Sequence, residues 1–136
     1  MNRRLLIEEL KRDEGVKLKP YLDSVGKLTI GIGRNIDDRG ITIEDAEYLC
    51  GNDIDICVQE LDRELPWWRG LTETRQRALV NMCFNLGMPK LSTFVRTLNA
   101  LEDGRWNDAA DAALDSRWAA QVGTRAVRIA TIFRTG

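Results

Sequence analysis

The chain has 136 residues, of which 43% are apolar and 30% are charged, a composition typical of one globular domain. Its formal net charge of -1 gives no general attraction for nucleic acid, although residues 35–65 are acidic and both flanking segments are basic. The absence of histidine excludes Ser/His and Cys/His nucleophilic sites. Three cysteines without a repeated short spacing indicate free thiols, so we expect no disulfide framework, no metal site and no cofactor.

A helix is predicted over residues 2–13, with Asn2 as its N-cap, leucines four residues apart, and Gly15 at its C-terminus. The leucine spacing places Glu14 on the apolar stripe in the last turn. Desolvation and the negative end of the helix dipole both disfavour a charged carboxylate there. A glutamate that stays protonated can serve as a general acid. The alternative is a solvated glutamate at a fraying helix end.

A hairpin is predicted after this helix. Asp23 begins the turn sequence Asp-Ser-Val-Gly, so its carboxylate should be exposed and ionised. In the strand expected over residues 27–33, apolar residues alternate with Thr29 and two glycines. The glycine face allows a ligand or another backbone to approach closely. Two carboxylates in unlike environments, Glu14 and Asp23, beside a threonine hydroxyl suit glycoside hydrolysis, although turn chemistry alone also explains Asp23.

The remaining chain is predicted to be mostly helical. A polar loop is expected over residues 35–40, then a helix capped by Thr42 that breaks at Gly51-Asn52, and a long amphipathic helix over 53–65. Later helices are predicted to start after Thr72, after Ser92, at Trp106, and at Gly123 or Thr124, with a short turn at Ser116-Arg117-Trp118. Cys50 and Cys57, seven residues apart, are expected to be buried thiols, and Trp67-Trp68 to pack in the core rather than stack on sugars.

Several motifs resemble those of one known family. The catalytic segment of the phage-type lysozymes, glycoside hydrolase family 24, is similar to Glu14-Gly15, Tyr21-Leu22-Asp23, Gly26 and Thr29-Ile30-Gly31-Ile32-Gly33. Later family segments are similar, in the same order, to Ile41-Thr42, Asp45-Ala46-Glu47, Asn81-Met82 with Phe84 and Gly87, Ser116-Arg117-Trp118, and Arg125-Ala126 with Arg128 through Gly136. The resemblance therefore covers nearly the whole chain, although longer family members carry more residues at the polar loop.

The resemblance implies a muramidase that cuts the β-1,4 link between N-acetylmuramic acid and N-acetylglucosamine in peptidoglycan, with inversion. It implies Glu14 as the general acid, Asp23 acting on the attacking water, and Thr29 placing that water. It further implies contacts to the saccharide or support of the site by other residues. These are Phe84, Thr97 and Asn35 as substrate-binding candidates, and Arg125, Arg34 and Asp53 as supporting candidates.

Three positions of this resemblance carry their own expectations. Arg125 matches the arginine that pairs with the catalytic glutamate, whereas its alternative is an exposed arginine at a helix start. Arg34 replaces a histidine that is frequent in the family, and we predict a charge pair between Arg34 and Asp53. A polar cleft position of the family aligns with Ala112, so that contact is expected to be lost.

The expected architecture is α+β and mostly α, a single lysozyme-like domain over residues 1–136. A small hairpin lobe over about 15–52 is expected to connect, through a helix over about 53–65, to a helical lobe over about 66–136 that includes the N-terminal helix. The first residues turn charged too early for a signal peptide, and no apolar run reaches the length of a membrane span. We therefore expect a monomer made in the host cytoplasm, without stable membrane association, that reaches the wall through a pore-forming holin.

Three other functions remain as alternatives. A weakly catalytic wall-binding module would bind peptidoglycan without releasing reducing ends. A lytic transglycosylase would use a lone glutamate and yield anhydro-muramic products. Nucleotide binding through Gly31-Ile32-Gly33 is disfavoured, because the third glycine of that fingerprint is missing and no βαβ unit surrounds it.

Overall fold

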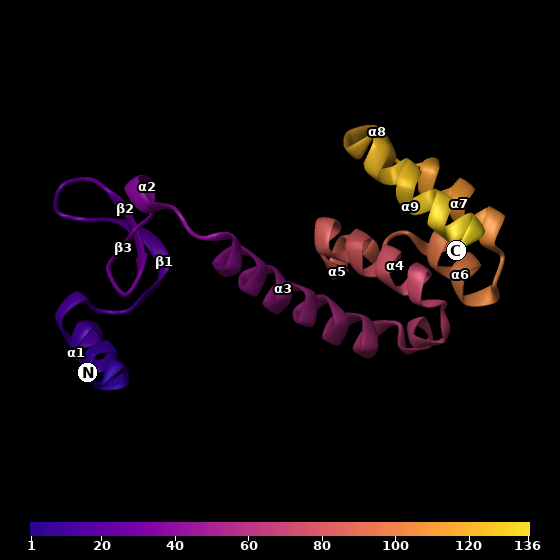
Figure 1. The fold of residues 1–136 in the computed structure, drawn as a ribbon. Coiled ribbons are helices and arrows are strands. Elements are labelled where there is room, and N and C mark those ends of the chain that lie inside the picture. The colour runs from indigo at the N-terminus through magenta and orange to yellow at the C-terminus, as the bar shows by residue number, and fades with distance from the viewer. The chain divides into compact units, whose positions relative to one another are not determined.

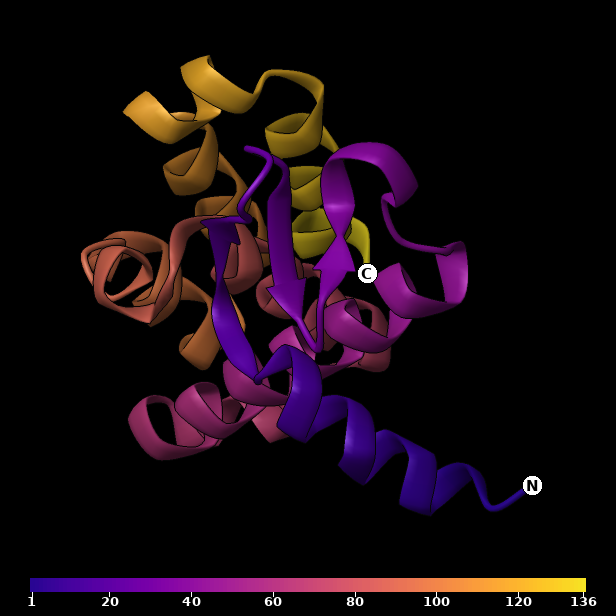
Figure 2. The same ribbon diagram turned by 90° about the vertical axis from the view of Figure 1, so that its left-hand side faces the viewer.

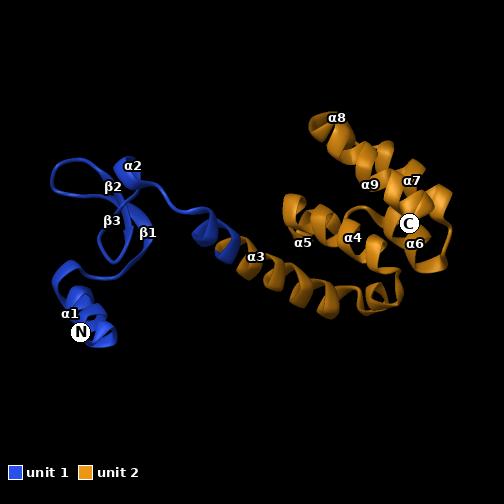
Figure 3. Cartoon of the chain, in the orientation of Figure 1, with its two compact units in different colours: residues 1–48 blue, residues 49–136 orange.

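The computed structural model describes all residues, Met1–Gly136. The chain divides into two compact units, unit 1 over Met1–Tyr48 and unit 2 over Leu49–Gly136 (Figure 3). Unit 1 contains the only sheet, and unit 2 is entirely helical. The predicted α+β, mostly α fold is therefore confirmed, while the predicted grouping of the first helix with the helical lobe stays a prediction.

Unit 1 combines two helices with a three-stranded antiparallel sheet of order β1-β2-β3. Its elements are α1 (Arg3–Glu14), β1 (Lys17–Leu22), β2 (Leu28–Gly31), β3 (Arg34–Asn35) and α2 (Ile36–Arg39), followed by the start of α3. Figure 2 shows the three strands side by side. Thr29 on the central strand is paired with Tyr21 of β1 and with Asn35 of β3. The centre of the sheet therefore carries one of the predicted site residues.

Helix α1 begins after Asn2 and ends before Gly15, as the sequence predicted. The side chain of Asn2 accepts a hydrogen bond from the Leu5 N–H at 3.1 Å, which satisfies one of the free N–H groups at the helix start. Gly15 ends the helix with a φ of 77°, and its N–H donates to the Lys11 carbonyl at 2.8 Å. The predicted caps are confirmed, and they place Glu14 in the last turn.

Two predictions between residues 35 and 64 are wrong. The expected polar loop instead contains β3 and the one-turn helix α2, because the Asn35 side chain accepts from the Asp38 N–H at 3.0 Å and caps that turn. The expected break at Gly51-Asn52 is absent, since α3 runs without interruption over Ile43–Glu64. One glycine costs a helix only about 1 kcal/mol relative to alanine, and every propagated residue adds a hydrogen bond.

Unit 2 packs its helices around one apolar core. Its elements after α3 are η1 (Pro66–Gly70), α4 (Glu73–Leu86), α5 (Met88–Leu91), α6 (Val95–Asp103), α7 (Trp106–Leu114), α8 (Arg117–Val122) and α9 (Thr124–Thr135). Helix α7 packs against α6 and α9, and α4 packs against α9 (Figure 1). None of the helices combines the length and the apolar composition that a membrane span needs.

The helix starts in unit 2 follow the predicted caps at some sites and depart from them at others. Thr72 caps α4 by accepting from the Arg75 N–H at 3.3 Å, as predicted. Ser92 does not start a helix, because its hydroxyl donates to the Met88 carbonyl at 2.9 Å at the end of α5, and α6 begins only at Val95. The turn predicted at Ser116 is instead the N-cap of the six-residue helix α8.

The core of unit 2 explains the aromatic and sulfur residues. Trp68 is only 2% exposed, and its indole N–H donates to Asp62 at 2.8 Å, so the prediction of core packing is confirmed for it. Cys57 and Cys83 are buried free thiols, and burial raises the pKa of both, that of Cys83 to about 12. Cys50 is exposed, which corrects the expectation that it is buried.

A buried arginine joins three helices of unit 2. Arg75 of α4 donates from Nε to the Phe133 carbonyl of α9 at 3.0 Å. Its guanidinium carbon lies 3.7 Å from the centre of the Trp106 ring of α7. The charge is thus compensated by a helix C-terminus and by an aromatic face, both of which attract cations.

Candidate functional site

Asp23 is held by the turn that connects β1 to β2. Its Oδ1 accepts hydrogen bonds from the Val25 N–H at 2.9 Å and from the Lys27 N–H at 2.8 Å. Its own N–H donates to the Lys27 carbonyl at 2.9 Å. These bonds restrain the carboxylate but engage only one of its two oxygens, so Oδ2 is available to a ligand or a water molecule.

Thr29 lies beside this turn on the central strand and is only 3% exposed. Its hydroxyl donates to the Lys27 carbonyl at 3.0 Å. The same carbonyl therefore accepts from both the Asp23 N–H and the Thr29 hydroxyl. A hydroxyl that donates in this way keeps its lone pairs as acceptors for a further donor.

Glu14, the last residue of α1, lies against Gly33 in the connection between β2 and β3. A Cβ atom at position 33 would lie only 2.8 Å from the Glu14 Oε2 and 3.0 Å from its Cδ. The glycine face was expected to admit a ligand or another backbone, whereas at Gly33 the group that approaches is the Glu14 side chain. Glu14 is exposed in unit 1, so the expected desolvation by the α1 stripe is not supplied within that unit.

Two further predicted site residues have local roles in unit 1. The Arg34 guanidinium donates from Nε and Nη2 to the Gly40 carbonyl at 3.1 Å and 2.9 Å. Asn35 caps α2 and donates from Nδ2 to Asp38 at 3.0 Å. Asp53 lies on the unit 2 part of α3 and is exposed. The predicted pair between Arg34 and Asp53, and the substrate-binding role of Asn35, stay predictions.

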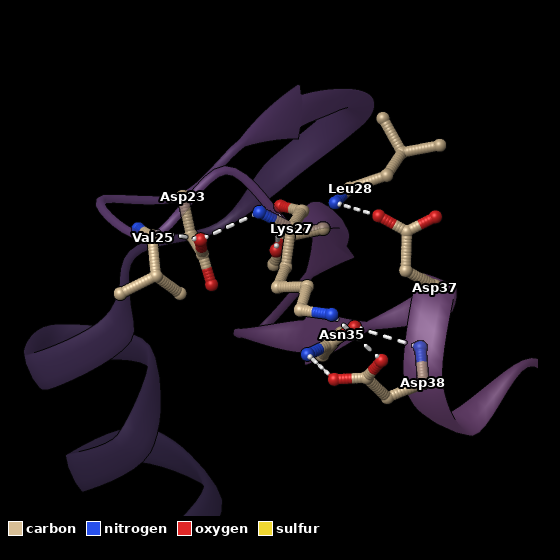
Figure 4. A network of polar contacts seen from close by, with 8 residues as sticks. Asp23, Val25, Lys27, Leu28, Asn35, Asp37 and Asp38 are labelled. Atoms are coloured by element: carbon tan, nitrogen blue, oxygen red, sulfur yellow. Dashed lines mark hydrogen bonds and ion pairs between the residues drawn. The ribbon is translucent and has the colours of Figure 1, made fainter.

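Two carboxylates that the sequence did not single out belong to the same network in unit 1 (Figure 4). The Leu28 N–H donates to the Asp37 Oδ2 at 2.6 Å, and the Lys27 ammonium lies 3.1 Å from the Asp38 Oδ1. The only local signal was a pair of acidic residues after a capping asparagine, a common arrangement at a helix start. Their connection to the Asp23 turn depends on tertiary structure.

In unit 2, Phe84 and Arg125 line one pocket of about 580 Å³. The Phe84 side chain is 43% exposed. Arg125, near the start of α9, donates to the Asn81 Oδ1 at 2.9 Å and to the Asn81 carbonyl at 3.3 Å. It is thus more than an exposed arginine at a helix start, since it ties α9 to α4. Its predicted pairing with Glu14 stays a prediction, because the two residues belong to different units.

Thr97 of α6 is 2% exposed and lines a second pocket of about 310 Å³ together with Ala112 of α7. Alanine offers no polar group at this place, and the expected loss of a saccharide contact there stays a prediction. The substrate-binding role of Thr97 stays a prediction. No group of three or more His, Cys, Asp or Glu side chains anywhere in the chain is arranged to hold a metal ion.

Comparison with known proteins gives one family and several relatives. A family model described as phage lysozyme matches residues 11–131. The chain is 28% identical to probable T4-type lysozyme 2 of Dictyostelium discoideum, over 96% of this chain and 94% of that protein. It is 34% identical to an endolysin of Acyrthosiphon pisum secondary endosymbiont phage 1, over 66% of this chain and 64% of that protein.

A further relative is a much larger protein. The chain is 31% identical to the pre-baseplate central spike protein Gp5 of Enterobacteria phage T4, over 96% of this chain but only 28% of that protein. The chain thus spans between a quarter and a third of the length of this relative. The aligned stretch covers 159 residues against the 136 of this chain, so the relative has additional residues inside the matched region.

Proposed function

Because the chain belongs to the phage lysozyme family and is a lysozyme-type peptidoglycan hydrolase, we propose that it cleaves the β-1,4 bond between N-acetylmuramic acid and N-acetylglucosamine. The observation that carries the assignment of roles is the arrangement in unit 1. There Asp23 and Thr29 share one backbone carbonyl, and Glu14 lies against the strand connection next to the same sheet. Two carboxylates beside a hydroxyl supply what glycoside hydrolysis requires.

Glu14 is the general acid in this proposal. It donates a proton to the glycosidic oxygen as the bond to the anomeric carbon breaks, so that the departing sugar leaves as an alcohol. Gly33 has no side chain, which leaves room for the Glu14 carboxyl group at the strand connection. The position of this group is therefore set by helix α1 and by the absence of a Cβ atom at one residue.

Asp23 and Thr29 handle the attacking water. The free Oδ2 of Asp23 accepts one hydrogen of the water, and the Thr29 oxygen accepts the other, which points the lone pair of the water at the anomeric carbon. Two backbone N–H groups already bind Asp23 Oδ1, so the carboxylate is held in place before the substrate arrives. Attack by water opposite to the leaving group inverts the anomeric configuration.

We further propose the setting of the reaction, which rests on membership of the phage lysozyme family and not on the geometry of unit 1. The substrate is bacterial peptidoglycan, and the exposed ring of Phe84 offers an apolar surface for one of its sugars. The protein acts as a monomer without nucleic acid or stable membrane association. It is made in the host cytoplasm and depends on a holin pore to reach the wall during lysis.

The test uses purified peptidoglycan sacculi and mass analysis of the released fragments for the wild type, Glu14→Gln and Asp23→Asn. Both substitutions keep the size of the side chain and remove its acid or base function. We expect the wild type to release fragments with hydrated reducing ends. Both variants should lose at least about 100-fold in rate while their circular dichroism stays that of the wild type.

Three outcomes would contradict this proposal in different ways. Anhydro-muramic products from an active Asp23→Asn variant would indicate a lytic transglycosylase. Sedimentation of the wild type with sacculi without any released fragment would indicate a wall-binding module. Full activity of Glu14→Gln would remove the acid from the position assigned to it.

A further inference from the structure

One peptide group connects the Asp23 turn to the rest of unit 1. The carbonyl of Lys27 and the N–H of Leu28 belong to the same planar peptide unit. On its carbonyl side this peptide accepts from the Asp23 N–H at 2.9 Å and from the Thr29 hydroxyl at 3.0 Å. On its N–H side it donates to the Asp37 carboxylate at 2.6 Å. The orientation of this one plane therefore affects both Asp23 and Thr29.

The bond to Asp37 is the strongest of these contacts. It is the shortest, and a carboxylate acceptor makes it charge-assisted, which roughly doubles the strength of a neutral hydrogen bond. A donor that is polarised in this way also makes the carbonyl on the other side of the peptide a better acceptor. Figure 4 shows the Asp37 carboxylate, on α2, directed at the Leu28 N–H.

Helix α2 is itself anchored, so the Asp37 carboxylate has a defined position. Asn35 caps the helix through its contact with the Asp38 N–H, and it pairs with Thr29 across β2 and β3. The Asp37 carboxylate, which binds β2, is therefore carried by a helix that is itself fixed to the same three-stranded sheet through Asn35 of β3.

We propose that Asp37 is a positioning residue for hydrolysis, which fixes the Lys27–Leu28 peptide plane and thereby the Asp23 carboxylate and the Thr29 hydroxyl. This inference rests on the proposed roles of Asp23 and Thr29. It differs from a purely structural role, in which Asp37 would only hold α2 on the sheet. A structural role changes stability, whereas a positioning role changes the rate of the chemical step without changing substrate binding.

The test compares Asp37→Ala with Asp37→Asn on soluble peptidoglycan fragments of defined length. Alanine removes the acceptor, whereas asparagine keeps an oxygen at the same place without the charge. We expect Asp37→Ala to lower kcat about 10- to 100-fold with KM near the wild-type value, because small displacements of reacting groups have effects of this size. Asp37→Asn should recover most of the rate.

The matched control is Glu44→Ala, which removes an exposed carboxylate from the first turn of α3 in the same unit. Glu44 accepts no hydrogen bond from any peptide group, so kcat should stay at the wild-type value. Amide hydrogen exchange supplies a readout that does not depend on activity. In Asp37→Ala, the Leu28 amide, which loses its acceptor, and the Asp23 amide, which donates to the Lys27 carbonyl, should both exchange faster than in the wild type.

Two results would overturn the inference while leaving the proposed function intact. One is an active wild type with an unchanged kcat in Asp37→Ala. The other is an Asp23 amide whose exchange rate is unaffected by loss of the Asp37 carboxylate, since the Lys27–Leu28 peptide plane would then not transmit the position of Asp37 to the Asp23 turn. A wild type that releases no product would instead contradict the proposed function, and the positioning role would fall with it.

Discussion

Substitution of Gly33 by alanine tests whether the position of Glu14 depends on the missing side chain. The new Cβ atom would lie 2.8 Å from Oε2, 3.0 Å from Cδ and 3.1 Å from Cγ of Glu14. Ordinary contacts of a Cβ atom begin near 3.4 Å, so the carboxyl group has to move by about half an ångström. Displacements of about 1 Å cost about 100-fold in rate, so we expect kcat to fall about 10-fold or more.

Backbone strain is the competing explanation, because Gly33 has a φ of +64°. A non-glycine residue held at such a positive φ costs on the order of 1–3 kcal/mol. Gly40→Ala is the control for strain without a clash, since Gly40 also has a positive φ (+58°, with a ψ of -151°) and no atom within 4 Å of a new Cβ. Urea denaturation measures the strain of each variant separately, and under conditions in which both variants are folded only Gly33→Ala should lose activity on sacculi. Equal activity of the two variants would refute the assigned contact between Glu14 and Gly33.

Three further predictions concern unit 2 and its pKa shifts. Iodoacetamide at pH 8 should label only the exposed Cys50 of the native protein. Burial raises the pKa of the Cys57 thiol and raises that of Cys83 to about 12, so almost no reactive thiolate forms at either position. Similar labelling rates at all three cysteines would contradict this prediction. Arg75→Ala should lower the free energy of unfolding, measured in urea, by about 2–4 kcal/mol, because the hydrogen bond to Phe133 and the contact with Trp106 are lost. Arg75→Lys should recover only part of this free energy. An unchanged urea midpoint for Arg75→Ala would show that these buried contacts contribute nothing to stability. Hydrogen bonds from Arg69 and Trp68 hold the pKa of Asp62 in the folded protein below its usual value of 3.8. The ionised Asp62 carboxylate therefore stabilises the fold above pH 3.8, and this stabilisation is lost as the pH falls through the lowered pKa of the folded state. The melting temperature of Asp62→Asn should therefore lie below that of the wild type at pH 6 and approach it in acid, and a difference that grows in acid would contradict the sign.

Local hydrogen bonds were the part of the fold that the sequence predicted well. Asn2 and Thr72 cap their helices because a short polar side chain reaches an N–H group three residues away, which requires no other part of the chain. The same logic failed at Ser92, where the hydroxyl turns back to the Met88 carbonyl at the end of α5. A serine that lies between two helices can either bond to the end of the first helix or cap the start of the second. The packing of the helices decides which of these two hydrogen bonds forms.

The sequence suggested the residues of the candidate site but not the contacts that those residues make in the structure. The turn predicted at Asp23 is present, but its carboxylate is half-buried rather than exposed, because Oδ1 accepts from two backbone N–H groups of the turn. The contact of Glu14 with Gly33 and the hydrogen bond from Leu28 to Asp37 could not be predicted from the sequence. Each contact joins two separate segments, and whether those segments meet depends on the register of the strands. The exposed Cys50 was missed for a similar reason: the period of a helix gives a shared face but not which face is covered.

The central claim is that Glu14 acts as the acid while Asp23 activates water, and the configuration of the first product tests it most directly. Proton NMR in the first minutes of hydrolysis of a β-1,4-linked peptidoglycan fragment distinguishes the two anomers of the new reducing end. Direct attack by an activated water predicts the α-anomer as the initial product. Initial formation of the β-anomer would show that a covalent or retained intermediate precedes water, and it would contradict the role assigned to Asp23.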